Sequence, residues 1–125
     1  MPKYKSEGFD PPAPVAHVKL KNIETGTILP NVPMLIDTGA DITVLPASAL
    51  EKLGVETDRD ASHKVQGFDG EIKEIKLARL SLSFLNKEFT GDFLVSNIPT
   101  GILGRNILNN IRLLLDGPSE RWDEQ

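Results

Sequence analysis

One stretch constrains the fold of this chain more than any other: residues 34–46, which read MLIDTGADITVLP. A run of apolar residues leads to Asp37, and a threonine and a glycine follow it at once. Val44 and Leu45 then resume the apolar pattern, and Pro46 ends it. The pattern predicts a buried strand, a tight turn and a second short strand.

The turn carries groups that suit chemistry. Asp37 stands at the inner end of the apolar strand, where an unpaired carboxylate costs several kcal/mol and needs partners. Thr38 offers a hydroxyl that can donate and accept a hydrogen bond beside that carboxylate. Gly39 permits a positive φ or the close approach of another chain. An aspartate before Thr-Gly also commonly caps its own turn, so the motif by itself leaves both interpretations open.

A second block lies downstream at residues 101–108, which read GILGRNIL. Together the two blocks resemble the retropepsin-like aspartic proteases. Residues 37–41 resemble the active-site loop of that family. Residues 101–108 resemble the element of two hydrophobic residues and a glycine, followed by Arg-Asn, that crosses behind the loop. Asp-Thr-Gly alone recurs by chance, but both blocks in this order with a glycine-bearing hairpin between them are a strong signal.

The resemblance implies a mostly β protein with a closed-barrel-like retropepsin (acid protease) fold, one or two short helices and one lobe per chain. It also implies an aspartic endopeptidase with Asp37 as the catalytic residue. Two carboxylates that share one proton can activate water, one as the base and the other as the acid. The chain holds one Asp-Thr-Gly, so the resemblance implies a homodimer in which Asp37 of each subunit meets at a twofold axis.

The same resemblance assigns roles to the neighbouring residues. Thr38 would hydrogen-bond across the dimer axis, and Gly39 would offer its backbone to an extended polypeptide substrate. Ala40 belongs to the same supporting loop. Asp41 would pair with Arg105, which suits the bidentate geometry of a guanidinium.

A flap is the remaining part that the resemblance implies. It would be the hairpin tip formed by Gly67, Phe68, Asp69 and Gly70, closing over bound peptide. Retroviral flaps usually carry more glycine than this tip, which holds Phe68-Asp69 instead. By composition alone the same four residues are equally compatible with a plain turn.

The domain boundaries follow from composition. Residues 1–14 are polar and proline-rich and predict an extended N-terminal arm. Residues 15–116 form the protease-like domain, and residues 117–125 a charged, mobile C-terminal tail. Within the domain, turn residues and alternation predict strands at 15–21, from 28 onward with interruptions at Pro30 and Pro33, and at 62–66, 71–77, 78–85, 88–95 and 111–115, with helices at 47–53 and 105–110.

Composition excludes several classes of function. The net charge of −4 over 125 residues argues against nucleic acid as a partner. The chain has no cysteine, and no cluster of histidine or carboxylate completes a metal site around Asp37 and Asp41, so neither a metal nor another cofactor is expected. No apolar run suits a signal peptide or a membrane span, which leads us to expect a cytoplasmic protein without membrane contact.

Two functions from different classes remain open. The first is the dimeric aspartic endopeptidase. The second is a non-catalytic dimerisation or peptide-binding module on the same fold. The intact Asp37-Thr38-Gly39 favours the enzyme, because a binding module has no need of a costly carboxylate at the end of an apolar strand.

Overall fold

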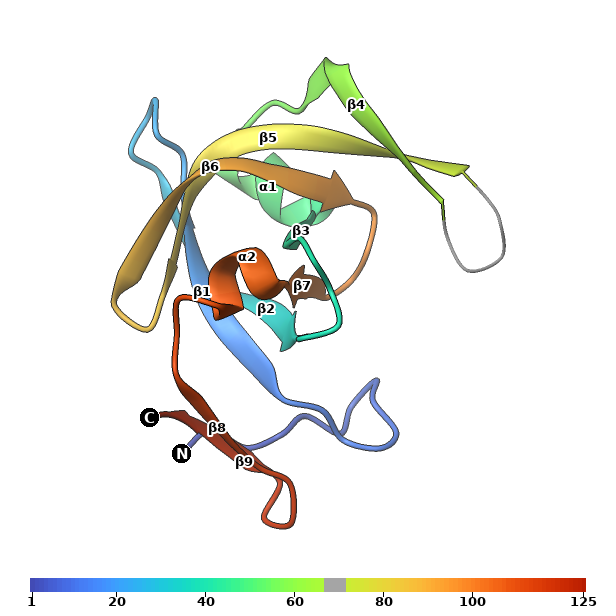
Figure 1. Cartoon of the computed structure of the whole chain (residues 1–125). Helices are drawn as coiled ribbons and strands as arrows, with labels where there is room; N and C mark the ends of the chain where they lie inside the picture. The colour runs from blue at the N-terminus through green and yellow to red at the C-terminus, as the bar shows by residue number, and fades with distance from the viewer. Residues whose placement is uncertain (67–71) are drawn as a thin grey trace.

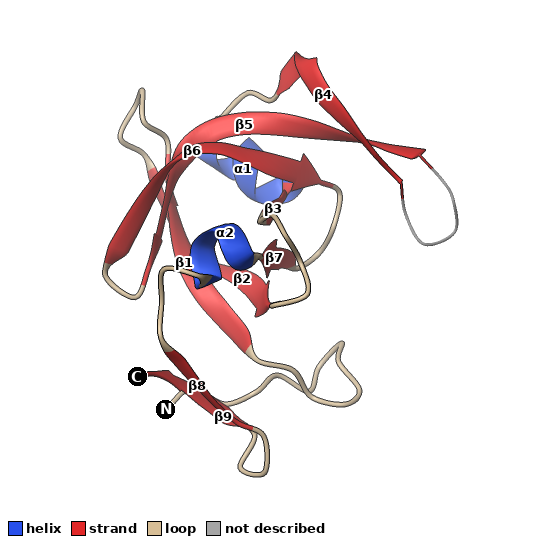
Figure 2. Cartoon of the chain, in the orientation of Figure 1, coloured by secondary structure: helices blue, strands red, loops and turns tan. Residues whose placement is uncertain are grey.

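The computed structural model describes residues 1–66 and 72–125, which form mainly strands with two short helices (Figures 1 and 2). Among these residues, no helix is long and apolar enough to span a membrane. In chain order the elements are β1 (Val15–Lys21), β2 (Ile28–Ile36), β3 (Val44–Pro46), α1 (Ala47–Leu53), β4 (Asp58–Gln66), β5 (Ile72–Phe84), β6 (Lys87–Ser96), β7 (Gly101–Leu103), α2 (Arg105–Leu108), β8 (Leu113–Asp116) and β9 (Arg121–Glu124).

Six of the strands close into a barrel. Neighbouring strands follow the order β1-β2-β7-β3-β6-β5, and β5 pairs back onto β1 through Lys19↔Ser83 and Lys21↔Ser81. Among the described strands, β4 pairs only with β5, and it extends away from the barrel (Figure 1). The mostly β, closed-barrel fold with few short helices is therefore confirmed.

The barrel interior is apolar, and strand alternation explains how it is filled. In β1 every second side chain is buried, including Ala16, Val18 and Leu20, whereas His17 and Lys19 are exposed. Residues of the other barrel strands and of both helices complete the same cluster. Burying a leucine-sized side chain contributes about 1.5–3 kcal/mol, so this cluster is the main source of stability.

β2 differs from the prediction, because Pro30 and Pro33 do not interrupt it. The register against β1 shifts where Leu20 pairs with Leu29 and Val18 with Val32, which leaves Pro30 and Asn31 in a bulge. Asn31 takes a φ of 60° there. Pro33 lies opposite His17. Ile36 N donates to Pro14 O, and hydrogen-bonded and non-hydrogen-bonded pairs alternate along an antiparallel ladder, so Pro33 and His17 form a non-hydrogen-bonded pair. The proline at residue 33 therefore removes no hydrogen bond between β1 and β2.

The first helix matches its prediction closely. α1 buries Ala49, Leu50 and Leu53 as one face. Gly54 follows it with a φ of 73°, and the next residue, Val55, donates its N–H to Leu50 O at 3.1 Å. This left-handed C-terminal cap satisfies carbonyls that the helix end would otherwise leave free.

The region predicted as two strands at 71–77 and 78–85 is one long strand, β5. Its turn into β6 lies at Leu85 and Asn86, both with positive φ, as a tight hairpin requires. Ser81 on β5 is buried, and its hydroxyl donates to Glu88 Oε1 at 2.6 Å.

The C-terminal residues also differ from the prediction of a mobile tail. β9 pairs antiparallel with β8, and Trp122 is buried against Phe84 with ring centroids 6.0 Å apart. The N-terminal arm lies along the other side of β9, where Trp122 N donates to Pro2 O at 3.0 Å. Arm, β9 and β8 therefore form one ribbon below the barrel, with both termini in it (Figure 1). The charged composition of residues 117–125 predicts a solvated tail, but their single aromatic residue, Trp122, is buried and holds β9 against the core.

The second helix is shorter than predicted. α2 covers Arg105–Leu108, and Asn109 and Asn110 form a turn rather than a further helical segment. The final apolar strand starts accordingly later, at Leu113 instead of residue 111, and ends at Asp116.

Candidate active site

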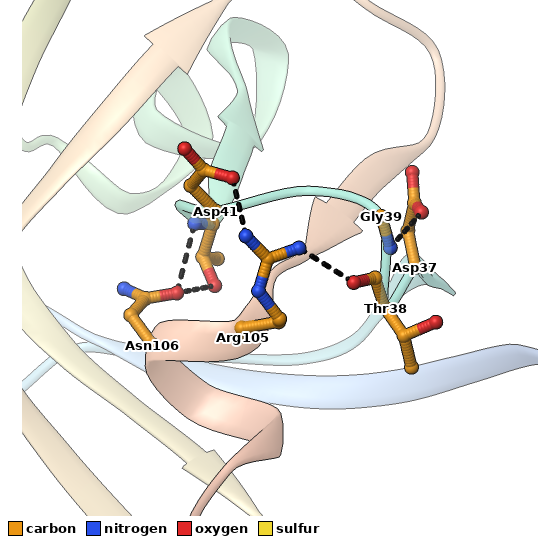
Figure 3. A network of polar contacts seen from close by, with 7 residues as sticks. Asp37, Thr38, Gly39, Asp41, Arg105 and Asn106 are labelled. Carbon is orange, nitrogen blue, oxygen red and sulfur yellow. Dashed lines mark hydrogen bonds and ion pairs between the residues drawn. The ribbon is translucent and has the colours of Figure 1, made fainter.

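The Asp37 turn follows the C-terminal end of β2, and hydrogen bonds from its backbone N–H groups hold it in place. Asp37 N donates to Leu103 O at 3.1 Å, which ties the turn to β7. Gly39 N donates to the Asp37 carboxylate oxygen Oδ1 at 2.9 Å (Figure 3). A Cβ on Gly39 would lie 3.1 Å from that same oxygen, so a side chain here would crowd the carboxylate.

The turn is more exposed than the sequence predicted. Asp37 is half-buried, and Thr38 and Gly39 are exposed. The apolar residues before Asp37 are buried in the barrel, but the chain reaches the surface as soon as β2 ends. In the single chain the carboxylate is therefore open on one side and free to meet another group.

β7 passes between β2 and β3 directly behind the turn, and its glycines make this possible. A Cβ on Gly101 would lie 2.2 Å from Met34 Sδ and 2.9 Å from Val44 O. A Cβ on Gly104 would lie 2.6 Å from the carbonyl carbon of Ile42. Real Cβ atoms do not approach this closely, so only glycine lets the second block lie against the first.

Arg105 joins the two blocks through three groups of the turn. Its backbone N–H donates to Ala40 O at 2.9 Å. Its guanidinium donates to Thr38 O at 2.7 Å and to the Asp41 carboxylate at 2.5 Å (Figure 3). The side chains are 41% exposed for Arg105 and 80% exposed for Asp41. The residues that the sequence assigned to an ion pair therefore meet in the structure, at the protein surface.

Two residues outside the predicted site form a second connection, and it is better buried. Asn106 Oδ1 accepts hydrogen bonds from the Thr43 hydroxyl at 2.7 Å and from Thr43 N at 2.9 Å (Figure 3). The same hydroxyl accepts from Gly104 N at 3.0 Å, and Thr43 is fully buried. Sequence reasoning missed Thr43. The available signal was a polar residue between Ile42 and Val44, directly before β3, together with an asparagine in the second block.

The predicted flap is described only at its base. β4 and β5 pair antiparallel up to Gln66↔Ile72, as the hairpin prediction requires. The tip residues Gly67, Phe68, Asp69 and Gly70 lie outside the described residues. Their assignment to substrate binding stays a prediction.

The described parts of the chain bring no three histidine, cysteine or carboxylate side chains together as a metal ion would require. What the site does hold is one carboxylate on a rigid turn. Asp37 Oδ1 accepts a hydrogen bond from Gly39 N, and among the side chains that the structure describes none donates to the second carboxylate oxygen. Such a group can take a proton from water or share one with another acid.

Residues 26–110 match the family described as "gag-polyprotein putative aspartyl protease". The chain belongs to this family. The match includes both the Asp37 turn and the block around Gly104.

Solved structures agree with the family match. EIAV protease complexed with the inhibitor HBY-793 shares 27% sequence identity with this chain, at a TM-score of 0.58. The alignment covers 78% of this chain and 86% of that protease. The curated proteins include no match. This member of the aspartyl protease family therefore has a retroviral-protease-like fold, and both findings support a protease function.

Proposed function

We propose that this protein is an aspartic endopeptidase that works as a homodimer, with Asp37 of each subunit at one shared site. The observation that carries the proposal is the Asp37 turn, whose carboxylate is fixed by Gly39 N on one side and open on the other. A carboxylate held in one orientation is ready to act, because it need not reorganise during the reaction.

The proposed chemistry uses two carboxyl groups and one proton. The ionised Asp37 takes a proton from a water molecule, and the oxygen of that water bonds to the carbonyl carbon of the peptide. The protonated Asp37 of the other subunit gives its proton to the carbonyl oxygen. When the tetrahedral intermediate collapses, one of its hydroxyl groups returns a proton to the second aspartate as the C=O bond re-forms. The C–N bond breaks, and the nitrogen leaves with a proton from the first aspartate, so both carboxyl groups regain their starting states.

The remaining site residues position the two catalytic carboxyl groups and the substrate. Arg105 and Asn106 hold the turn from behind, so the two carboxylates would meet in a constant geometry. Thr38 is exposed beside Asp37, where its hydroxyl is available to a second subunit. The substrate would be an extended polypeptide that adds to the site as a strand, covered by the hairpin of β4 and β5.

The test is hydrolysis of a peptide library by wild-type protein and by Asp37→Asn, with and without a pepstatin-type inhibitor. An amide cannot serve as the base, so we expect the variant to lose at least about 1,000-fold in kcat/KM while its melting temperature is unchanged. Substantial cleavage by pure Asp37→Asn protein contradicts the mechanism. A wild-type protein that binds peptides without cleaving them supports the non-catalytic module instead.

A further inference from the structure

Two cavities lie side by side at the surface, and the segment that links α1 to β4 lines both of them through Val55 and Glu56. The first cavity, of about 930 Å³, lies between α1 and the neighbouring parts of β5 and β6. The second, of about 740 Å³, lies between the β1–β2 turn and the middle of β5. β5 lines the first at Lys76 and the second at residues 77–79, so the two cavities form one groove along this strand, the β5 groove.

Part of the β5 groove is an unpaired strand edge. β1 pairs with β5 only as far as Ser81, and β4 pairs with it only up to Leu77, so in the described part of the chain neither strand covers the residues between. The two-residue β5–β6 turn makes Phe84↔Lys87 a hydrogen-bonded pair, and such pairs alternate without a register shift along the two strands. Arg79, five residues before Phe84, therefore directs its backbone N–H and C=O away from β6 and toward the groove.

The floor of the groove is apolar. Leu50 and Val95 line the first cavity and Ala78 lines the second, and all three are buried residues of the core. Ile23 stands at the end of the second cavity with 46% of its surface exposed. An apolar side chain from a partner would remove this surface from water, which is favourable.

The rim of the groove is charged, and carboxylates outnumber basic groups there. The described lining holds four carboxylates and two basic side chains: Glu24, Glu51, Glu56, Asp92, Lys76 and Arg79. Asp92 and Arg79 form an exposed ion pair with each other at 3.8 Å. Three carboxylates then remain for one lysine, so the described rim attracts a positively charged partner.

We propose that the β5 groove binds an extended segment of a basic polypeptide in which apolar and basic residues alternate. Side chains of an extended chain point to opposite sides in turn, so every second one can enter a cavity. The long, flexible side chains of the lysines or arginines between them can reach the carboxylates of the rim. The backbone of the segment can hydrogen-bond to Arg79, as an added strand does. A second copy of this chain is a poor match, because its net charge is −4.

The groove adjoins the elements that carry the proposed active site. Ala47 in the first cavity directly follows β3, and Asn97 begins the loop that leads to β7. β5 continues from Lys76 back to Ile72, at the base of the predicted flap. A polypeptide cleaved at Asp37 can thus lay a more distant part of its chain along the groove. This role rests on the proposed function, and it makes basic polypeptides the preferred substrate class.

The first test measures binding without cleavage, in Asp37→Asn protein at physiological salt. Fluorescence anisotropy follows a labelled peptide of alternating lysine and leucine. A glutamate–leucine peptide changes its charge, and a lysine–serine peptide removes its apolar side chains. We expect the lysine–leucine peptide to bind at least about five-fold more tightly than either.

Two charge reversals in the same Asp37→Asn protein locate the binding in the groove. Glu56→Lys, at a residue that both cavities share, should weaken binding of the lysine–leucine peptide about five-fold. Lys76→Glu should strengthen it by a similar factor, a gain that a folding defect cannot produce. Glu7→Lys is the matched control, because Glu7 is exposed on the N-terminal arm and lines neither cavity. Circular dichroism verifies that each variant is folded.

Kinetics of protein that retains Asp37 test the role in substrate selection. The library peptide that is cleaved best is compared with the same peptide joined at either end, through a flexible linker, to the lysine–leucine segment. One of the two extensions should lower KM about five-fold with kcat unchanged, because the added segment holds the substrate without touching the cleaved bond. Glu56→Lys should bring the ratio of the two KM values back toward one, and Glu7→Lys should not.

The outcomes separate this proposal from the proposed function. Peptide binding that responds to Glu56→Lys and Lys76→Glu, in a protein that cleaves nothing, upholds the groove and overturns the proposed function. Equal binding of the three peptides, or equal effects of Glu7→Lys and Glu56→Lys, overturns the groove. So does an effect of Glu56→Lys on self-association in place of peptide binding. Binding that responds while KM stays unchanged overturns the role in substrate selection.

Discussion

Individual residues hold the Asp37 turn through two separate connections to the second block. One is the Arg105 side chain, which reaches Thr38 O and the Asp41 carboxylate at the surface. The other is the buried set formed by Thr43, Gly104 and Asn106. Their burial differs, and this difference decides how much each contributes to stability.

Arg105→Ala should cost more stability than Asp41→Ala. The Asp41 carboxylate is 80% exposed, so water replaces its partner and the loss should be about 1 kcal/mol or less. Arg105→Ala also removes the bond to Thr38 O, which should bring the total to about 1–2 kcal/mol. Urea denaturation of both variants and the double variant measures this, and equal losses from the two single changes would contradict it.

Thr43→Val should be more destabilising than its small volume change suggests. The variant keeps the shape but removes the hydroxyl that donates to Asn106 and accepts from Gly104 N. Gly104 N is then left buried without this partner, and Asn106 Oδ1 keeps only the hydrogen bond from Thr43 N. We expect a loss of about 1–3 kcal/mol in the free energy of unfolding. Thr90→Val, at an exposed position in β6, is the control and should change little. A Thr43→Val protein as stable as the control would show that this connection is unimportant.

Among the secondary-structure elements, β7 sets the geometry of the site, because it brings the second block against the Asp37 turn. Gly104→Ala tests this packing. The added Cβ would lie 2.6 Å from backbone of Ile42, which cannot move aside as a side-chain end can. We expect a loss of about 1–3 kcal/mol or more and a parallel loss of activity.

Gly117→Ala is the matched control for this change, because nothing lies within 4 Å of the added Cβ. Thermal melts of the two variants give the comparison. If both melt together with the wild type, the packing of the second block against the Asp37 turn does not require glycine at residue 104.

The elements that the sequence predicted are those with strong local signals. Alternation in β1 and the apolar face and Gly54 cap of α1 are properties of neighbouring residues, so they appear in the sequence. The contact between the Asp37 turn and the Gly104 block is not local. It was predicted through the family resemblance. The physical reason for the glycines is that a Cβ at Gly101 or Gly104 would lie too close to atoms of the first block.

The elements that were missed depend on distant partners. Pro30 and Pro33 read as breaks in β2, but a bulge against β1 accommodates one and the unbonded pairing the other. β9 reads as a solvated tail, and its strand forms because Trp122 packs on Phe84 and both neighbouring strands supply hydrogen bonds. Thr43 directly precedes β3 and carries no local signal of its role, because only the fold brings it to Asn106.

The whole molecule presents a single Asp37 on an exposed turn, and the proposed chemistry needs two. Two features of the turn are compatible with a second chain at this site: the Asp37 carboxylate is open on one side, and Thr38 is exposed. The central claim is that one active site takes one aspartate from each of two chains.

Mixing wild-type protein with Asp37→Asn protein tests that claim most directly. At a fixed amount of wild-type chain, an equal amount of the variant should lower peptide cleavage to about half after subunit exchange, since half of the wild-type chains then have inactive partners. A nine-fold excess should lower it to about one tenth. An unrelated protein at the same concentrations serves as the control. Cleavage that stays constant as the variant is added would show that each chain carries a complete site, and would contradict the account.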